Sequence, residues 1–559
     1  MDNIMELSRK LVIEALKKSV HNAIEKRELS SVELPNFTVE VPHKKNHGDF
    51  ATNLAMVLAK PTKKQPREIA EIIVSGFKAD NIPVRNIEIA GPGFINVYLE
   101  WNWLHPVIED VIKQSRDYGR VALGNNRKVQ VEFVSANPTG LLHMGNARGA
   151  ALGDSIAAIL EFAGFDVERE YYINDAGSQI ENFAKSLEVR YLQHFGKNVS
   201  MPEDGYRGED IIQTVEKFVQ NYGDEFLNTD SVVRRKQLVE FALTEKLESI
   251  RTSLRDFGVE YDNWFSERYL HENKIIDVTI EELQKRGYTY EKEGALWFEA
   301  TAFGDDKDEV LIRVNGIPTY FAADIAYHKN KFERGFEHII DIWGADHHGH
   351  VKRMKGSMQA LGYSPDDLEI ILLQLVRLVR DGEVVRMSKR TGNVVTLAEL
   401  LDEVGKDAAR YFFVMMSPDT HLEFDIDLAK SQSNENPVFY IQYAHARICS
   451  ILRQIENDGR YNLNEVDLSL LKEQTEIDLI KKIAMFPMEI SLSAEMRSPH
   501  RIAKYVHDLA GLFHSFYNAH RVIISDVELS NARIALIMAV KIVICNALKL
   551  IGVSAPEKM

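Results

Sequence analysis

Two short stretches of the sequence contain residues that could bind a polyphosphate, and the first is His143-Met144-Gly145-Asn146. These residues follow a loop rich in turn-forming residues and open a segment with apolar residues at helical spacing. A helix N-terminus offers unpaired backbone N–H groups and a partial positive charge, both of which favour phosphate. His143 adds a ring donor, and Gly145 lets a flat base approach the backbone. The alternative is a helix start that contains an incidental histidine.

The second stretch is a basic segment far downstream. Its cations lie close together in the sequence: Arg377, Arg380, Arg386, Lys389 and Arg390. Gly382 and Gly392 bracket the centre of the segment, so the loop can hinge. A cationic loop that closes over a polyphosphate stabilises the charge that develops on departing phosphate oxygens. If the basic segment is considered by itself, a solvated loop explains it. The presence of both this segment and the helix start with His143 favours phosphate binding. Neither GxxxxGK[ST] nor GxGxxG occurs in the sequence.

The helix start is expected to be held by a parallel sheet. Residues 129–134 form an apolar, β-branched run typical of a buried strand, and residues 135–140 form a loop. A helix follows from Met144 to a left-handed cap at Gly164, and residues 167–173 are a second apolar strand. Strand, helix and strand in this order predict a parallel pair with a right-handed crossover. We assign the later strand-like segments to the return of the same sheet, namely residues 294–298, 310–314, 338–343 and, as one run, 369–379.

The rest of the sequence is expected to form further domains, because 559 residues exceed what a single core accommodates. Residues 1–115 are expected to form a mixed α+β domain, and residues 116–432, which contain the predicted parallel sheet, have a charged insertion at about 185–265. Residues 433–559 show helical periodicity without strand signals, which predicts a helical bundle. A basic cluster near the start fits either a phosphate backbone or a solvated loop, and comprises His43, Lys44, Lys45 and His47.

The composition is that of a soluble globular protein, with 45% hydrophobic and 27% charged residues. No apolar run reaches the roughly 18 residues of a spanning helix, and the first residues lack the apolar core of a secretory signal. The only two cysteines, Cys449 and Cys545, exclude a disulfide framework and a cysteine-based zinc site, so we expect a reducing cytosol. A net charge of −16 argues against indiscriminate nucleic-acid binding, although a local basic track remains compatible with it.

These motifs resemble those of a known enzyme family. HMGN, followed much later by RMSK, is similar to the HIGH and KMSKS signatures of class I aminoacyl-tRNA synthetases. The surrounding segments specifically resemble the bacterial arginyl-tRNA synthetases: SANPTGLLHMGNARGAALGD, YYINDAGSQ, YFAADIAYH and WGADHHGH. The resemblance covers essentially the whole chain, including HGDFATN near the start and VFYIQYAHAR in the helical third. Two positions depart from the signatures: Asn146 stands for the second histidine and Arg386 for the first lysine. An amide still donates a hydrogen bond, and the arginine keeps the charge.

The resemblance implies an α/β fold, with a Rossmann-like parallel-sheet catalytic domain, an N-terminal α+β domain and a C-terminal all-α anticodon-binding bundle. It implies an arginine–tRNA ligase that activates L-arginine with ATP and Mg²⁺, and then transfers the arginyl group to the 3′ end of tRNA(Arg). The catalytic residues that it implies, which bind the phosphates as charge accumulates, are His143, Asn146 and Lys389. Contacts to ATP are implied for Met144, Gly145, His347, Met387 and Ser388. No covalent enzyme intermediate is needed, because positioning and charge stabilisation dominate both steps.

Arginine recognition requires acidic residues, because a guanidinium group has five donors and no acceptor. By resemblance, the amino acid is contacted by Glu132, Ser135 and Asn137, and its guanidinium group by Tyr320 and Asp324. The last two lie four residues apart and share one face if the segment is helical. Asp324 would discriminate against lysine, which lacks the planar fork. A strand glutamate such as Glu132 often faces solvent, but the apolar strand around it favours a buried role with a cationic partner.

The helical third resembles the anticodon-binding bundle of the family, and the first domain resembles its tRNA-elbow-binding module. Tyr440, Tyr443 and Arg447 lie at helical spacing on one side, where they could stack on unpaired bases. Core packing explains the two tyrosines equally well, whereas Arg447 favours an exposed edge. A monomer in the cytoplasm is expected from the resemblance.

A metal site is a further possibility at the segment that contains Asp346, His347, His348 and His350. The spacing of these residues lacks the i, i+4 geometry of helical zinc pairs, so no protein-bound metal is expected. Magnesium would arrive with ATP, held mostly by phosphates and water.

Two other functions stay open from the residues alone. One is a related ligase for a different amino acid, against which Glu132 and Asp324 argue if the substrate is apolar. The other is a catalytically silent relative that binds tRNA, against which the presence of both His143 and Lys389 argues.

Overall fold

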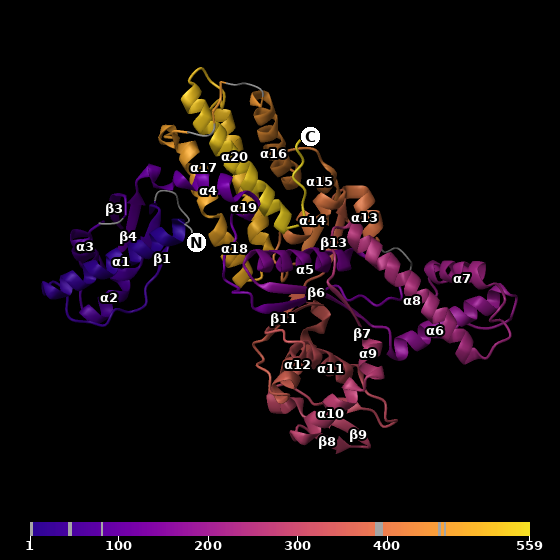
Figure 1. Cartoon of the computed structure of the whole chain (residues 1–559). Helices are drawn as coiled ribbons and strands as arrows, with labels where there is room; N and C mark the ends of the chain where they lie inside the picture. Colours follow the sequence, from indigo (N-terminus) through magenta and orange to yellow (C-terminus); the bar gives the residue numbers. More distant parts are fainter. Residues whose placement is uncertain (1–3, 43–46, 80–81, 386–394, 457–459, 463–465) are drawn as a thin grey trace.

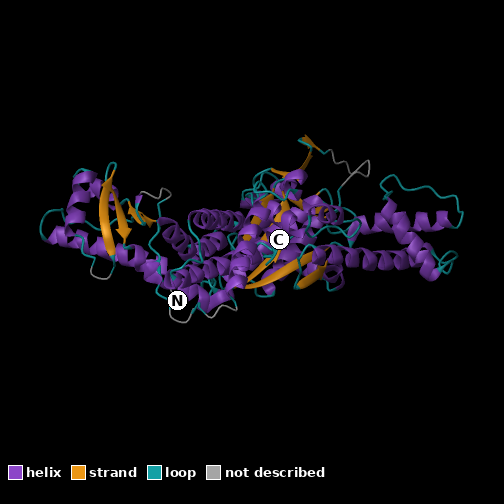
Figure 2. Ribbon diagram, turned by 90° about the horizontal axis from the view of Figure 1, so that it is seen from above, coloured by secondary structure: helices purple, strands orange, loops and turns teal. Residues whose placement is uncertain are grey.

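The computed structural model describes residues 4–42, 47–79, 82–385, 395–456, 460–462 and 466–559. Figure 1 shows a central α/β domain, with the N-terminal domain on one side, a helical bundle above it and a projecting helical insertion on the other side. Seen from above, the N-terminal domain and the insertion lie at opposite ends of an elongated molecule (Figure 2). Among the described residues, no helix combines the length and apolar character needed to cross a bilayer.

The central domain is built on a five-stranded parallel sheet. Its strands, in spatial order, are β12 (Leu368–Leu373), β11 (His338–Gly344), β5 (Lys128–Glu132), β6 (Asp166–Ile173) and β7 (Asn263–Ser266). The chain runs outward from β5 through β6 to β7 and later returns to the other side of β5 with β11 and β12. The strand order therefore reverses between β5 and β11, and ligands of open α/β sheets bind at the carboxyl ends of strands at such a point.

Helix α5 (Met144–Phe162) crosses this sheet between β5 and β6, as the apolar spacing predicts. Its approach to the sheet is close, because a Cβ atom on Gly153 would lie 2.1 Å from Cγ of Phe133. Gly164 adopts a φ of 87° just beyond the helix, which confirms the expected left-handed cap.

Three of the expected sheet assignments are wrong, wholly or in part. The runs at 294–298 and 310–314 form a separate antiparallel sheet of β8 (Thr289–Lys292), β9 (Ala295–Phe298) and β10 (Glu309–Ile312). The run at 369–379 is not one strand, because the chain leaves β12 and starts β13 (Val376–Arg380) in another sheet, with β14 (Glu383–Val384) and β15 (Leu422–Asp425). A short apolar run identifies a strand but not its partner, which tertiary pairing decides.

The insertion follows β6 and ends at the edge strand β7. It contains α6 (Gly177–His194), α7 (Glu209–Tyr222) and α8 (Ser231–Asp256). These helices have a core of their own that includes Phe183, Leu187, Tyr191 and Phe218. The chain then returns to the sheet, and its helices α9 (Glu267–Glu272), α10 (Ile275–Lys285), α11 (Tyr320–Glu333) and α12 (His348–Ala360) lie below the sheet in Figure 1.

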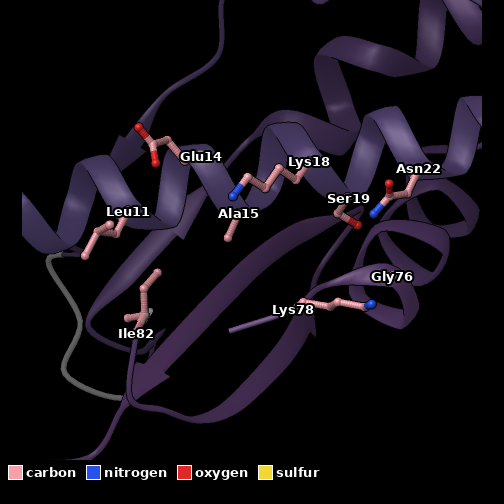
Figure 3. A pocket seen from close by; sticks show the side chains of 9 residues that line it. All are labelled: Leu11, Glu14, Ala15, Lys18, Ser19, Asn22, Gly76, Lys78 and Ile82. Carbon is pink, nitrogen blue, oxygen red and sulfur yellow. The ribbon is translucent and has the colours of Figure 1, made fainter. Parts of the chain in front are cut away.

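The N-terminal domain packs three helices on an antiparallel sheet. The helices are α1 (Ile4–Glu25), α2 (Leu54–Thr62) and α3 (Pro66–Gly76), and the strands in spatial order are β1 (Val39–Glu40), β2 (Phe50–Thr52), β4 (Phe94–Leu99) and β3 (Val84–Ala90). A cavity of about 230 Å³ lies between α1 and the segment after α3 (Figure 3). All of the residues that line this cavity belong to the N-terminal domain, so the cavity is separate from the carboxyl ends of the parallel strands.

The C-terminal third is helical, as expected. Helix α4 (Pro106–Gln114) links the N-terminal domain to this region, and α13 (Leu397–Val404), α14 (Lys406–Val414) and α15 (Ile426–Lys430) precede the bundle. The bundle consists of α16 (Pro437–Ile455), α17 (Gln474–Ala484), α18 (Phe486–Glu495), α19 (Pro499–Ala519) and α20 (Val527–Leu550). Buried Arg410 of α14 joins it to the catalytic domain, because its guanidinium contacts Asp154 of α5 at 2.6 Å and the carbonyl oxygen of Ile551 at 3.1 Å.

The two cysteines, although far apart in the sequence, approach the same buried histidine in the bundle. Sγ of Cys545 lies 3.1 Å from Nε2 of His445, and Sγ of Cys449 lies 3.8 Å from its Nδ1. Burial raises the pKa of the Cys545 thiol to about 11, which keeps it protonated at neutral pH.

Candidate active site

His143 caps the N-terminus of α5. Its Nδ1 accepts a hydrogen bond from the backbone N–H of Gly145 at 3.1 Å, which leaves the proton of the neutral ring on Nε2. The side chain of Asn146 completes a capping box, because its Oδ1 accepts the N–H of His143 at 3.1 Å. The helix start thus fixes the orientation and the tautomer of the histidine.

The two residues between His143 and Asn146 have different surroundings. A Cβ on Gly145 would lie 3.1 Å from the His143 ring, so the glycine makes room for the capping imidazole. Met144 is 1% exposed, and its N–H donates to the carbonyl oxygen of Val395. Its side chain therefore packs in the core.

Residues 395–397, which follow the basic segment, are attached to the same helix start. Thr396 pairs with His143 as an antiparallel bridge, and the N–H of Leu397 donates to the carbonyl oxygen of Leu142 at 2.9 Å. Upstream, Arg377 is exposed on β13, and Arg380 pairs with Glu403 at 2.6 Å. Several residues named from the sequence lie outside the described residues: His43, Lys44, Lys45, Arg386, Met387, Ser388, Lys389, Arg390 and Gly392.

The loop after β5 has a strained backbone. Val134 and Ser135 have φ angles of 69° and 39°, values that are unusual without glycine and especially so for a β-branched residue. Hydrogen bonds hold the loop on both sides: the Tyr171 hydroxyl donates to the carbonyl oxygen of Ala136, and the Tyr261 hydroxyl donates to that of Phe133. Strain of this kind occurs at functional sites, where the surroundings enforce it.

Glu132 is buried with a cationic partner, as the apolar strand around it predicts. Nζ of Lys331, on α11, lies 2.5 Å from its Oε2, and the Ser135 hydroxyl donates to its Oε1 at 2.8 Å. Asn137, which is exposed on the same loop, donates to Gln179 of α6 at 2.8 Å. Three of the residues expected to contact arginine therefore lie together at the carboxyl end of β5.

Tyr320 and Asp324 share one face of α11, which confirms that their segment is helical. The Tyr320 hydroxyl lies 2.8 Å from that of Ser178, and Nε2 of His350 lies 3.2 Å from a carboxylate oxygen of Asp324. The side chain of Asp324 is 37% exposed, so a ligand can reach the carboxylate.

Sequence reasoning missed a second acid beside Asp324. Glu267, at the start of α9, is 3% exposed and is hydrogen-bonded to Tyr172. Burial, reinforced by the charge of Asp324, raises its pKa. Two neighbouring carboxyl groups of this kind attract a cation. The available signal was its position directly after the strand-like run that becomes β7.

The histidines after β11 are mostly exposed. His347 follows the carboxyl end of that strand, with its ring centroid 6.2 Å from that of Trp343. Within the described ranges, no group of three or more His, Cys, Asp or Glu side chains is arranged to hold a metal ion.

The bundle has an aromatic surface cluster around Arg447. The guanidinium carbon lies 4.4 Å from the ring centroid of Tyr443 and 4.5 Å from that of Tyr517, which sequence reasoning did not name. Tyr443 is 36% exposed, whereas Tyr440 is half-buried against His514, with ring centroids 4.5 Å apart. Core packing thus accounts for Tyr440 better than for Tyr443.

A parallel sheet with a capped histidine at its switch point defines a class of protein, that of the class I tRNA synthetases. The model for "tRNA synthetases class I (R), catalytic domain" matches residues 107–417. The models for the "Arginyl tRNA synthetase N terminal domain" and the "DALR anticodon binding domain" match residues 14–99 and 441–559.

The chain belongs to the arginyl-tRNA synthetase family. It is 61% identical to an arginine–tRNA ligase of Desulforamulus reducens over the whole of both chains, and 56% identical to one of Moorella thermoacetica over the same share. The fold is similar to that of Thermus thermophilus arginyl-tRNA synthetase, with a TM-score of 0.73, 22% identity, and coverage of 98% of this chain and 100% of that one.

Proposed function

We propose that the chain activates L-arginine with ATP, forming arginyl-adenylate and pyrophosphate, and then transfers the arginyl group to the 3′ end of tRNA(Arg), releasing AMP. The observation that supports this most directly is the attachment of residues 395–397, which directly follow the basic segment, to the helix start that His143 caps. A carboxylate oxygen of arginine attacks the α-phosphorus of ATP, and the bond to the pyrophosphate oxygen breaks.

The phosphates bind at the N-terminus of α5. His143, with its proton on Nε2, donates to a phosphate oxygen as charge accumulates there, and Asn146 and Lys389 act with it. Gly145, His347, Met387 and Ser388 lie along the adenosine and ribose. Magnesium arrives with ATP and is held by its phosphates and water.

The arginine side chain extends toward α11. Its guanidinium lies between the carboxylates of Asp324 and Glu267, with the Tyr320 hydroxyl beside it. Lysine binds this site less tightly than arginine, because an ammonium group cannot make two parallel hydrogen bonds to one carboxylate. The α-carboxylate and α-amino groups lie near Ser135, Asn137 and Glu132, at the carboxyl end of β5.

The tRNA contacts the two outer domains. Arg447, with Tyr443 and Tyr517, offers a stacking surface for unpaired bases, and Tyr440 supports it from within. The N-terminal domain contacts the tRNA elbow. The domain boundaries lie near residues 115 and 432, the insertion expected at about 185–265 includes all of α6, and the enzyme is a cytoplasmic monomer.

Arginine-dependent exchange of pyrophosphate into ATP, measured with and without tRNA(Arg), tests this proposal. We expect exchange with arginine and none with lysine. Exchange that depends on another amino acid would instead identify a different ligase, and tRNA binding without any exchange would identify a silent relative.

A further inference from the structure

A chain of buried charged groups lies beneath the proposed arginine pocket. It starts at Glu132 of β5, continues through Lys331 of α11 and Asp341 of β11, and ends at His328 of α11. Lys331 contacts Glu132 at 2.5 Å and Asp341 at 2.7 Å, and His328 contacts the other oxygen of Asp341 at 2.7 Å. The side chains of Lys331 and Asp341 are both 0% exposed.

The two ends of this chain reach both sides of the pocket. At one end, Glu132 accepts the Ser135 hydroxyl, whose oxygen in turn accepts the N–H of Tyr172 at 3.1 Å. At the other end, Nδ1 of His328 lies 2.7 Å from the backbone carbonyl oxygen of Asp324. The same network therefore touches the strained loop after β5 and the helical turn that presents Asp324.

The charge of each group follows from its partners. A carbonyl oxygen only accepts, so Nδ1 of His328 carries a proton, and Nε2 donates to Asp341. Burial opposes the ionisation of Asp341, but Lys331 and His328 outweigh it and lower the pKa of that carboxyl group. Burial raises the pKa of Glu132, and the charge of Asp341 adds to this rise, whereas Lys331 opposes it. The network thus has three ion-pair contacts, Glu132–Lys331, Lys331–Asp341 and Asp341–His328.

Stability alone does not explain such an arrangement. Apolar residues of similar volume often stabilise a core as well as a buried ion network does, because desolvation offsets the attraction between the charges. What a network of directed bonds adds is a defined geometry. Here it fixes α11 against β5 and β11, and α11 presents both Tyr320 and Asp324.

We propose that Lys331, Asp341 and His328 are positioning residues for arginine recognition, which hold the Asp324 turn of α11 in register with the loop after β5. This inference rests on the proposed placement of arginine between these two elements. None of the three residues touches the substrate, and their effect passes through Asp324 and Ser135. Their loss should therefore weaken the use of arginine and leave that of ATP unchanged.

The double variant Asp341→Asn/His328→Gln tests the inference without leaving a buried charge unpaired. It removes one ion pair completely, and the amide oxygen introduced in place of the Asp341 carboxylate can still accept from Lys331. We expect KM for arginine in pyrophosphate exchange to rise about tenfold, since small misplacements of binding groups are costly. KM for ATP should stay within about twofold of the wild-type value, because no ATP contact has changed.

Tyr327→Phe is a matched control on the same helix. It removes an equally buried hydrogen bond, from the Tyr327 hydroxyl to Glu170 at 2.6 Å, and Glu170 is also bound by Arg334. The phenyl ring stays in place, so the contact of Nζ of Lys331 with this ring, 4.4 Å from its centroid, is kept. We expect this variant to lose thermal stability and to keep the wild-type KM for arginine. A double variant with an unchanged KM for arginine, or with KM for arginine and ATP raised equally, would overturn the inference.

Two further variants make every outcome decisive. If the double variant does not fold, His328→Gln alone is judged by the same criterion, because its amide can still donate to Asp341. Asp324→Asn separates the inference from the placement of arginine on which it rests. If KM for arginine is unchanged in Asp324→Asn, that placement fails, whereas an unchanged KM in the network variants alone overturns only the positioning role.

Discussion

His143 and Thr396, which are far apart in the sequence, pair with each other as an antiparallel bridge. On one side of this bridge begins α5, whose first N–H groups already have partners, since Met144 donates to the carbonyl oxygen of Val395 and Gly145 to the ring of His143. On the other side begins α13, which Thr396 caps together with Glu399. This bridge therefore holds the starts of two helices together. It also connects the residues that follow the basic segment to His143, which this segment is expected to assist in phosphate binding.

The role of His143 in phosphate binding can be separated from its role as a helix cap. His143→Ala removes both, whereas His143→Ser keeps a good cap and removes only the ring donor. We expect both variants to lose roughly 100- to 1,000-fold in the rate of pyrophosphate exchange, as expected for the loss of one donor to developing charge. Only His143→Ala should also lose about 1 kcal/mol of stability. Wild-type exchange in His143→Ser would show that the ring does not bind phosphate.

The neighbouring carboxylates of Asp324 and Glu267 should both be required for arginine. Asp324→Asn and Glu267→Gln each remove one charge and keep the shape of the side chain. We expect each to raise KM for arginine by about 30-fold or more, because breaking a buried charge pair costs about 2–5 kcal/mol. Glu272→Gln, an exposed change on the same short helix as Glu267, is the control and should have no effect. Normal arginine use by Glu267→Gln would limit the guanidinium site to Asp324.

A change in the aromatic cluster of the bundle should impair the use of tRNA and leave the use of arginine and ATP unaffected. Arg447→Ala removes the cation between Tyr443 and Tyr517. We expect KM for tRNA(Arg) in aminoacylation to rise about 5- to 100-fold, the range expected for the loss of one base-stacking contact. Arg453→Ala changes an exposed arginine on the same helix and serves as the control. Equal effects of both changes would indicate general electrostatic attraction in place of stacking.

Local patterns predicted the elements that hold the phosphate site, but not all of their partners. The apolar spacing of α5 and the two flanking strands determined the parallel pair, because a crossover helix allows little else. The strands at 295–298 and 309–312 were assigned to the wrong sheet, since a short alternating run leaves the partner strand open. Glu267 was missed because only the packing of α9 against α11 brings it close to Asp324. Lys331 belongs to a polar sequence that suggests a solvated face, yet it is completely buried, because two acids from different strands surround it.

The buried His328 gives a pH dependence with a defined sign. Burial disfavours the charged ring, but the charge and hydrogen bond of Asp341 outweigh it, so the pKa of His328 is raised above its ordinary value of 6.5. Lys331, which disfavours the charged ring, and Glu132, which favours it, are the other charged groups that face the histidine. A group with a raised pKa in the folded state contributes stability that is complete below its unfolded pKa and is lost as pH rises through the folded value.

We therefore expect the thermal stability of the wild-type protein to exceed that of His328→Gln most at about pH 6 and progressively less toward alkaline pH. Asp341 does not produce this trend, because its lowered pKa confines its own loss of stability to acid pH. Melting curves of both proteins between about pH 6 and pH 9 measure the difference, and contributions from the other histidines cancel in it. A difference that grows with pH would mean that the ring is neutral in the folded protein, and that Asp341 is held by Lys331 alone.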